Sequence, residues 1–330
     1  MNLKNNDSFR STWKIPASDF SINHSSKILM MGSCFSENIH QKLTFHKFQS
    51  TVNPYGVIFN PNILFNGINK IIQTEESPKA NLVNHDQLWH SLDHHSSFSE
   101  PKKNDCLSRI NDSAKKLRAA LVNANCLILT FGTAFIYKHL SSDKFVANCH
   151  KIPQSEFKKS LLNISDIISE FEKMHQLLKK INPSIKIILT VSPVRHWKDG
   201  VIKNQRSKSI LHLAIGEICK NFSTVEYFPS YEIVMDDLRD YRFYKPDLLH
   251  PNQIAIDYIW EKFANIYFDQ KTLDLNKTIS QIQKSVHHRP QHPQSIKNKE
   301  FLLDLKAKIQ ILQMQHPNLD FTSELECLNV

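Results

Sequence analysis

The sequence predicts an α/β fold, a three-layer α/β/α sandwich with a mainly parallel sheet, followed by a C-terminal helical extension. Short apolar runs alternate with longer amphipathic stretches along most of the chain. This alternation is typical of repeated βα units, whose strands pair in parallel with helices on both faces. Polar turns of unusual composition also follow directly on several apolar runs. In an open parallel sheet, ligand sites lie beyond the carboxyl ends of the strands, where such turns gather.

The predicted strands are short apolar runs, as expected for strands that are buried on both faces. They cover residues 27–31, 48–52, 126–131, 185–191 and 225–228, and residues 135–138 and 144–148 resemble a hairpin. The predicted helices have apolar residues at helical spacing. They cover residues 36–43, 60–73, 105–123, 158–181, 205–221 and 252–268. Residues 75–104 are polar and predict loops around a short strand at Trp89.

The composition changes near residue 276, and we predict a main domain over 1–275 and an extension over 276–330. Residues 284–293 are polar and contain two prolines, which predicts a connector. Residues 297–315 have the apolar stripe of an amphipathic helix. We expect this helix to pack on the main domain or on another subunit, so that an oligomer could form through it.

The composition argues against several classes of protein. The chain carries 41 Lys and Arg against 32 Asp and Glu, but no long basic block, zinc-finger spacing or aromatic-basic RNA-binding signature. We therefore expect a basic surface of the bacterial type and no nucleic-acid partner. Only 6 glycines occur, and none of them forms a glycine-rich phosphate loop. No nucleotide cofactor, and no other cofactor, is expected.

Several features predict a cytoplasmic protein without a membrane partner. Residues 1–10 are polar and show no secretory signal, and the longest apolar runs are too short to cross a bilayer. The 6 cysteines are widely spread and form no C-x-x-C pair, which favours reduced thiols. His85, His90, His94 and His95 lie close in sequence but lack a paired Cys/His set, so no metal site is expected.

Ser33 lies in the turn between the first predicted strand and its helix. A serine there sits at a helix N-terminus, where free N–H groups and the helix dipole stabilise developing negative charge. A serine nucleophile and its oxyanion need such surroundings. Ser33 could equally be a plain helix N-cap.

Asp247 and His250 lie three residues apart in a turn before a predicted helix. In this arrangement the carboxylate can fix the tautomer of the imidazole and direct it toward a nucleophile. A capping Asp beside a surface His would have the same spacing.

Several ordered blocks of the chain resemble the GSCFA domain family, which is itself similar to the SGNH/GDSL esterase superfamily. The blocks read MGSCFSEN over 31–38, NPYGVIFNP over 53–61, FGTA over 131–134, ANCHK over 147–151, TVSPVRH over 190–196 and LRDYRFY over 238–244, and they end with Asp247 and His250. The resemblance covers nearly the whole chain.

The resemblance implies a catalytic triad of Ser33 as nucleophile, His250 as general base and Asp247 as its orienting carboxylate. The superfamily motif Gly-Asp-Ser aligns with Gly32-Ser33-Cys34, however, so Cys34 occupies the place of the superfamily serine. A helix N-terminus and a nearby His250 would favour a thiolate there. Cys34 is therefore the alternative nucleophile.

The resemblance also implies that Gly56 donates its N–H to the oxyanion. The asparagine that the superfamily carries in a Gly-x-Asn block is replaced, because the matching stretch here reads Gly-Thr-Ala over 132–134. Losing one oxyanion donor typically costs a factor of about 10²–10³ in rate. Thr133, Asn53 or Asn148 could supply the missing donor.

Arg195 and His196 follow a predicted strand end and could bind an anionic part of a substrate, although a surface Arg in an ion pair is an equally good interpretation. We expect a serine-dependent ester hydrolase or acyltransferase that acts on an O-acylated sugar or a similar small acyl ester. The alternatives are a thiol hydrolase that uses Cys34, or a binding protein that retains the fold without catalysis.

Overall fold

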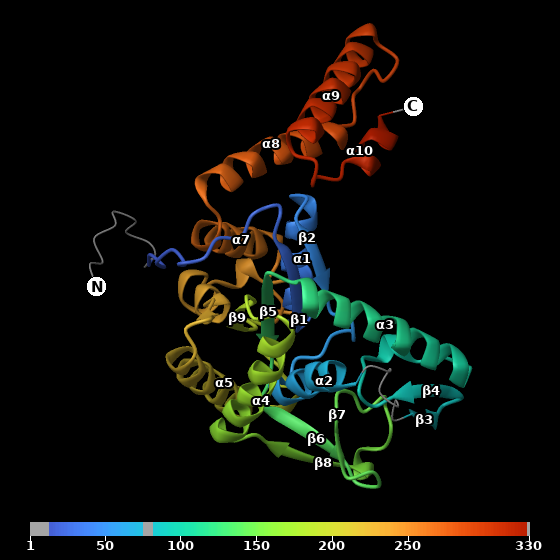
Figure 1. Ribbon diagram of the computed structural model, residues 1–330, viewed down its shortest axis with the longest axis vertical. Helices are drawn as coiled ribbons and strands as arrows, with labels where there is room; N and C mark the ends of the chain where they lie inside the picture. The colour runs from blue at the N-terminus through green and yellow to red at the C-terminus, as the bar shows by residue number, and fades with distance from the viewer. Residues whose placement is uncertain (1–12, 75–81, 329–330) are drawn as a thin grey trace.

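The computed structural model describes residues 13–74 and 82–328. Residues 1–10, for which no secretory signal was expected, and residues 75–81 of the predicted loop region lie outside these ranges. At the centre is a five-stranded sheet with the order β10-β9-β5-β1-β2 (Figure 1). The strands are β1 (Lys27–Gly32), β2 (Gln49–Val52), β5 (Cys126–Phe131), β9 (Lys186–Val191) and β10 (Val225–Tyr227). Every pair in this sheet is parallel, which confirms the predicted sheet type.

The strand order reverses at β1, and this reversal creates the place for a site. From β1 the chain continues to β2 on one side, and it later returns to β5 on the other side. Ligands of open α/β sheets bind at such a switch point, outside the carboxyl ends of the strands. Gly32 ends β1 and pairs with Thr130 of β5, so the turns that follow β1 and β5 begin side by side.

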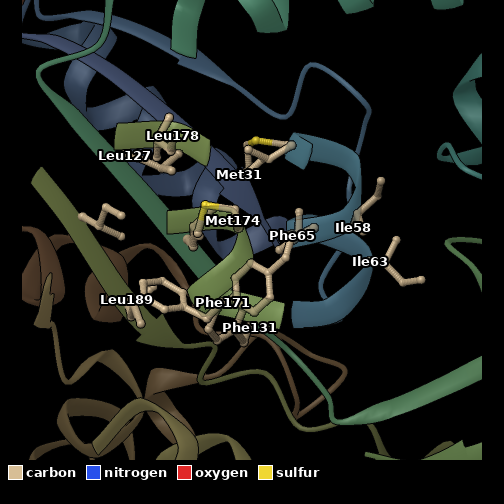
Figure 2. Close-up of a cluster of buried hydrophobic side chains, with 14 of the residues drawn as sticks. Met31, Ile58, Ile63, Phe65, Leu127, Phe131, Phe171, Met174, Leu178 and Leu189 are labelled. Carbon is tan, nitrogen blue, oxygen red and sulfur yellow. The ribbon is translucent and has the colours of Figure 1, made fainter. Parts of the chain in front are cut away.

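Successive strand residues point to opposite faces, and each face packs on its own helices. Leu29 and Leu127 pack on α2 (Pro61–Gln73), α3 (Lys103–Asn123), α4 (Ile164–Ile181) and α5 (Val201–Asn221). Figure 2 shows Leu127 of this cluster together with Phe65 of α2 and Phe171 of α4. Ile28 and Ile128 pack on α1 (Cys34–Phe45) and α7 (Gln253–Tyr267). The three-layer α/β/α architecture is therefore confirmed. Within the described residues, no helix has the length and apolar composition to span a membrane.

The predicted helix over 158–181 is wrong in its first part. Residues Phe157–Leu161 form strand β8, which pairs antiparallel with β6 (Phe135–His139). On its other edge β6 pairs with β7 (Lys144–Val146), as the predicted hairpin required. The helix begins only after Asn163, whose side chain and that of Asp166 form a reciprocal capping box. Pairing with an existing hairpin edge outweighs the helical periodicity of this stretch.

Residues 82–104 are more ordered than predicted. Strand β4 (Leu88–Ser91) contains the predicted position Trp89, but it also pairs with a second strand, β3 (Leu82–His85), that the sequence pattern did not indicate. In Figure 1 this hairpin and the β7-β6-β8 sheet lie at one end of the molecule, and the C-terminal helices lie at the other end.

The C-terminal helices are α8 (Gln270–Val286), α9 (Ile296–Gln315) and α10 (Thr322–Cys327), and they share a small apolar core of their own. Helix α9 matches the predicted helix, whereas α8 was not predicted and extends into the predicted connector. Glu324 of α10 is buried, and it accepts hydrogen bonds from Lys47 Nζ at 2.6 and 2.7 Å and from Gln283 Nε2 at 2.6 Å. Lys47 precedes β2, so the extension is held at the amino ends of the strands, away from the switch point.

Lys208 is the unusual polar residue of the core. It lies on the apolar face of α5 and is fully buried, and its Nζ donates to the Ser192 carbonyl at 2.6 Å. In the part of the chain that the structure describes, no carboxylate lies within ion-pair distance of it. Burial above all, and then the charge of Arg195, lowers the pKa of Lys208 to about 7. Ser192 directly follows β9, so this lysine reaches the carboxyl edge of the sheet.

Replacing Glu324 should loosen the C-terminal helices from the main body. In Glu324→Ala, Lys47 and Gln283 lose a buried acceptor, and breaking a buried ion pair costs about 3–5 kcal/mol. Amide hydrogen exchange in α8 and α10 should accelerate. The matched control is Asp274→Ala, which removes an exposed ion pair with Lys277 that is worth at most about 1 kcal/mol. Equal acceleration in both variants would contradict this role of Glu324.

Lys208 should make stability depend on pH with a defined sign. Its pKa is about 7 in the folded chain against an ordinary value of 10.5, so between these values the unfolded chain holds a proton that the folded chain lacks. The residue therefore destabilises the fold increasingly as the pH falls from 10.5 to about 7. In Lys208→Met, the gain in unfolding free energy over wild type should be largest near pH 7 and shrink toward pH 10.5. Denaturant titrations across this range measure it, and a pH-independent difference would refute it.

Candidate functional site

The corner between β1 and α1 forms the centre of the candidate site. Gly32 has φ = +145°, and a Cβ at this position would collide with the Thr130 carbonyl of β5. Only glycine tolerates both conditions. The Ser33 N–H donates to that carbonyl at 3.1 Å, and Ser36 Oγ donates to Thr130 Oγ1 at 2.8 Å. The corner therefore holds the first turn of α1 against the end of β5.

Ser33 is the N-cap of α1. Its side chain is 2% exposed, and its Oγ accepts the Phe35 N–H at 3.2 Å. A hydroxyl that satisfies a free N–H of the first helical turn stabilises the helix in the usual way. Among the described residues, no hydrogen bond joins the side chain of Ser33 or of Cys34 to His250.

Cys34 is the first residue of α1, and its side chain is partly exposed. Burial above all, and then the Glu37 carboxylate, raises the pKa of the thiol. The N–H groups of Cys34 and Phe35 and the charge of Lys245 act in the opposite direction, because they stabilise a thiolate. The thiol is therefore protonated at neutral pH and needs a base to become a nucleophile.

Asp247 and His250 form the geometry that a general base requires. Asp247 Oδ2 accepts the His250 Nδ1–H at 2.7 Å, and Oδ1 accepts the N–H groups of Leu249 and His250, both at 2.9 Å. The two N–H groups and then the imidazole lower the pKa of Asp247 to about 2. The ionised carboxylate thus fixes the imidazole tautomer with its lone pair on Nε2.

The loop that carries this pair lies beside the residues that follow β9, because Leu248 and Leu249 line a pocket with Arg195. The Lys245 N–H donates to the His250 carbonyl at 2.7 Å, and the Asn252 side chain caps α7. The charge of Lys245 acts on Cys34, and the charge of His250 acts on His196, which follows β9. The Asp247–His250 turn is therefore close enough to interact electrostatically with the residues that follow β1 and β9.

Gly56 and Asn53, two of the predicted oxyanion donors, lie in one turn after β2. The Gly56 N–H is already donated to the Asn53 carbonyl at 2.7 Å. Asn53 is buried, and its Oδ1 accepts the Gly32 N–H at 2.8 Å. Its Nδ2 lies 3.4 Å from a carboxylate oxygen of Glu37, at the long limit for a hydrogen bond. Asn53 therefore brings an amide N–H group to the β1–α1 corner.

Thr133 and Asn148, the other two predicted donors, are used within the fold. Thr133 Oγ1 lies 2.9 Å from Ser207 Oγ and accepts the Phe135 N–H at 3.1 Å. Asn148 Oδ1 accepts the His150 N–H at 2.9 Å in the segment after β7. No described hydrogen bond joins either residue to the β1–α1 corner.

His196 and Arg195 lie after β9 and differ in their surroundings. The His196 ring stacks on Phe59, and its buried Nε2 has no partner within the described residues. Burial above all, then the charges of Lys208 and His250, lowers the pKa of His196 to about 4, so the ring is neutral. Arg195 lines a pocket against the Asp247–His250 turn.

Lys208 is the residue of this region that the sequence interpretation missed. Its charge interacts with Arg195 and with Cys34. It falls on the same helical face as Leu211, Ile215 and Ile218, and a lysine in such an apolar stripe is a signal that sequence can provide. No group of three or more His, Cys, Asp or Glu side chains that could hold a metal ion occurs over 13–74 and 82–328.

Comparison with solved structures finds similar chains at low identity. A carbohydrate esterase of family 3 from Talaromyces cellulolyticus is 9% identical, with a TM-score of 0.34, over 77% of this chain and 99% of that one. An acetyl esterase mutant with acetate ion is 10% identical, with a TM-score of 0.35, over 77% and 100%. A family 3 carbohydrate esterase from Clostridium thermocellum is 11% identical, with a TM-score of 0.32, over 77% and 98%. A search of curated proteins finds no significant match.

Comparison with family models agrees with the blocks seen in the sequence. The GSCFA family matches residues 27–263, and the C-terminal domain of GSCFA domain proteins matches residues 279–330. The first match includes the β1–α1 corner, the residues after β9 and the Asp247–His250 turn. The chain belongs to the GSCFA family.

Proposed function

We propose that this chain is an acyl ester hydrolase or acyltransferase that works through a covalent acyl-enzyme. The observation that carries the proposal is the hydrogen bond of 2.7 Å from His250 Nδ1 to Asp247, which leaves Nε2 free to accept a proton. A nucleophile at a helix N-terminus and an oriented imidazole are the two parts that acyl transfer needs.

We propose Cys34, rather than Ser33, as the nucleophile. Ser33 Oγ is buried and accepts the Phe35 N–H as the helix cap, whereas Cys34 is partly exposed. The thiol also interacts electrostatically with Lys245, which is hydrogen-bonded to His250 through its main chain. Ser33 as the nucleophile stays a prediction that the same experiment tests.

In the proposed reaction, His250 Nε2 takes the proton of the Cys34 thiol as sulfur attacks the ester carbonyl. The Cys34 N–H at the helix N-terminus and Asn53 Nδ2 are the donors that the corner offers to the oxyanion. His250 then gives its proton to the leaving alcohol, and a thioester remains on Cys34. Water or an acceptor hydroxyl, deprotonated by His250, releases the acyl group and restores the thiol.

We propose an O-acylated sugar as the first substrate class to test, and the cytoplasm as the place of action. A binding protein without catalysis is the second candidate. One observation favours it: the N–H groups of Ser33 and Gly56 and the hydroxyl of Thr133 are already hydrogen-bonded to other parts of the protein. Few donors are therefore left for an oxyanion.

The nucleophile can be identified by hydrolysis of p-nitrophenyl acetate and by the mass of the trapped acyl-enzyme. Cys34→Ala should lower kcat by a factor of at least about 10³ and abolish the added acyl mass, because the attacking atom is gone. Ser33→Ala should retain acylation and lose about 1 kcal/mol of stability as a helix cap. The opposite pattern would make Ser33 the nucleophile, and no acylation of wild type would support the binding protein.

Asp247→Asn should lower kcat by a factor of about 10²–10⁴, because an amide does not hold the imidazole tautomer. Since the pKa of Asp247 is about 2, its carboxylate stays ionised well below neutral pH, and its contribution to stability is lost only as the pH falls from about 4 toward 2. If the activity of wild type falls on acidification while the pH is still above about 4, a group other than Asp247 must be responsible. A pH–rate profile of wild type and Asp247→Asn, taken down to the limit of stability, tests this. An unchanged kcat in Asp247→Asn would contradict the proposed role of the carboxylate.

A further inference from the structure

We infer that the pocket beside the Asp247–His250 turn binds a carboxylate of the substrate through Arg195, so that the preferred substrate is an acyl ester of an acidic sugar. This inference rests on the proposed function and adds the chemical class of its substrate. It is carried by the position of the pocket and by the unpaired guanidinium group of Arg195.

The pocket adjoins the proposed catalytic turn directly. Its lining includes Arg195, Trp197, Tyr241, Tyr244, Leu248 and Leu249. Two other charged residues, Arg239 and Asp240, also line it, and each is held in an ion pair, with Asp236 and Arg242 respectively. The two leucines stand between Asp247 and His250 in sequence, and Leu248 has φ = +59° and is 49% exposed. A group bound in the pocket would therefore lie next to the imidazole that is proposed to act on the ester.

The guanidinium group of Arg195 has almost no partner in the protein. Its one hydrogen bond runs from Nε to Asn204 Oδ1 at 3.4 Å, and across residues 13–74 and 82–328 no carboxylate forms an ion pair with it. By contrast, Arg239 pairs with Asp236 at 3.1 Å, and Arg242 pairs with Asp240 at 3.7 Å. The two terminal nitrogens of Arg195 thus remain available for the bidentate contact that carboxylates make with arginine.

Arg195 is partly shielded from water, and a second basic side chain, Lys208, acts on it electrostatically. Arg195 is half-buried, and the fully buried Lys208 behind it has no carboxylate partner in the described chain. The charge of Arg195 reaches Lys208, Tyr231 and Tyr244. A partly desolvated cation without a counter-ion is unfavourable, and a carboxylate bound to Arg195 would remove that cost.

The rest of the pocket is suited to a ring. Trp197 and Tyr241 line it and are 47% and 69% exposed, so much of each side chain is accessible to a ligand. Pockets of this kind combine apolar and aromatic walls with a few polar groups that fix orientation. A sugar ring against the aromatic side chains, with its carboxylate on Arg195, satisfies both requirements.

The test compares two substrates that differ only in the carboxylate, an O-acetylated methyl glucuronoside and the matching O-acetylated methyl glucoside. Wild type should show a kcat/KM about 10- to 100-fold higher for the acidic substrate, as expected for a charge-assisted hydrogen bond. Arg195→Gln should bring the ratio close to one. Lys198→Ala removes an exposed positive charge three residues from Arg195 and should retain the preference. This control distinguishes direct contact with Arg195 from long-range electrostatic attraction.

Binding of methyl glucuronoside, measured by calorimetry, separates this inference from the proposed function because it needs no turnover. Binding that Arg195→Gln weakens by at least about 10-fold, and that Arg195→Lys restores in part, supports the inference even if no ester is hydrolysed. Equal binding to wild type and Arg195→Gln, or no binding to folded wild type, overturns it. Circular dichroism of each variant confirms the fold.

Discussion

The parallel pairing of β1 with β5 is the constraint on which the candidate site depends. The sheet extends through β5 on one side of β1, and β2 pairs with β1 on the other side. The strand order therefore reverses beside the β1–α1 corner. The pairing also explains Gly32, since the Thr130 carbonyl occupies the space that a side chain would need. The same carbonyl accepts the Ser33 N–H, and α1 therefore begins at a fixed place above the sheet.

Two neighbouring residues of this corner, Ser33 and Cys34, have different roles. A helix that starts directly after a strand needs an acceptor for its first free N–H groups, and Ser33 supplies it. Ser33 is buried as the cap, whereas the next residue, Cys34, is partly exposed. Its thiol is protonated because burial and Glu37 disfavour the thiolate, and this is the condition under which an oriented imidazole is useful.

Charge is distributed differently at the two ends of the sheet. At the amino ends of the strands, Lys47 and Glu324 pair in a buried contact, and the C-terminal helices are held there. At the carboxyl ends, Lys208 and Arg195 have no carboxylate partners within the described chain. Paired charges stabilise the docking of an element, whereas unpaired charges are costly for the fold and are usual at sites that bind anions. The extension and the candidate site are therefore separate in position and in physical role.

The α/β class, the five strands of the central sheet to within one residue, and the Asp247–His250 pair could be predicted from the sequence, because they depend on local periodicity and on spacing within one turn. Tertiary structure decided the rest. Phe157–Leu161 is a strand because the edge of β6 was available, and the hydroxyl of Ser33 is a cap because α1 starts against β5. The geometry of the turn after β2 decides that the Gly56 N–H is already donated. Packing between distant parts of the chain decides that Lys208 is buried and that the guanidinium group of Arg195 has almost no partner. No spacing pattern in the sequence predicts these features.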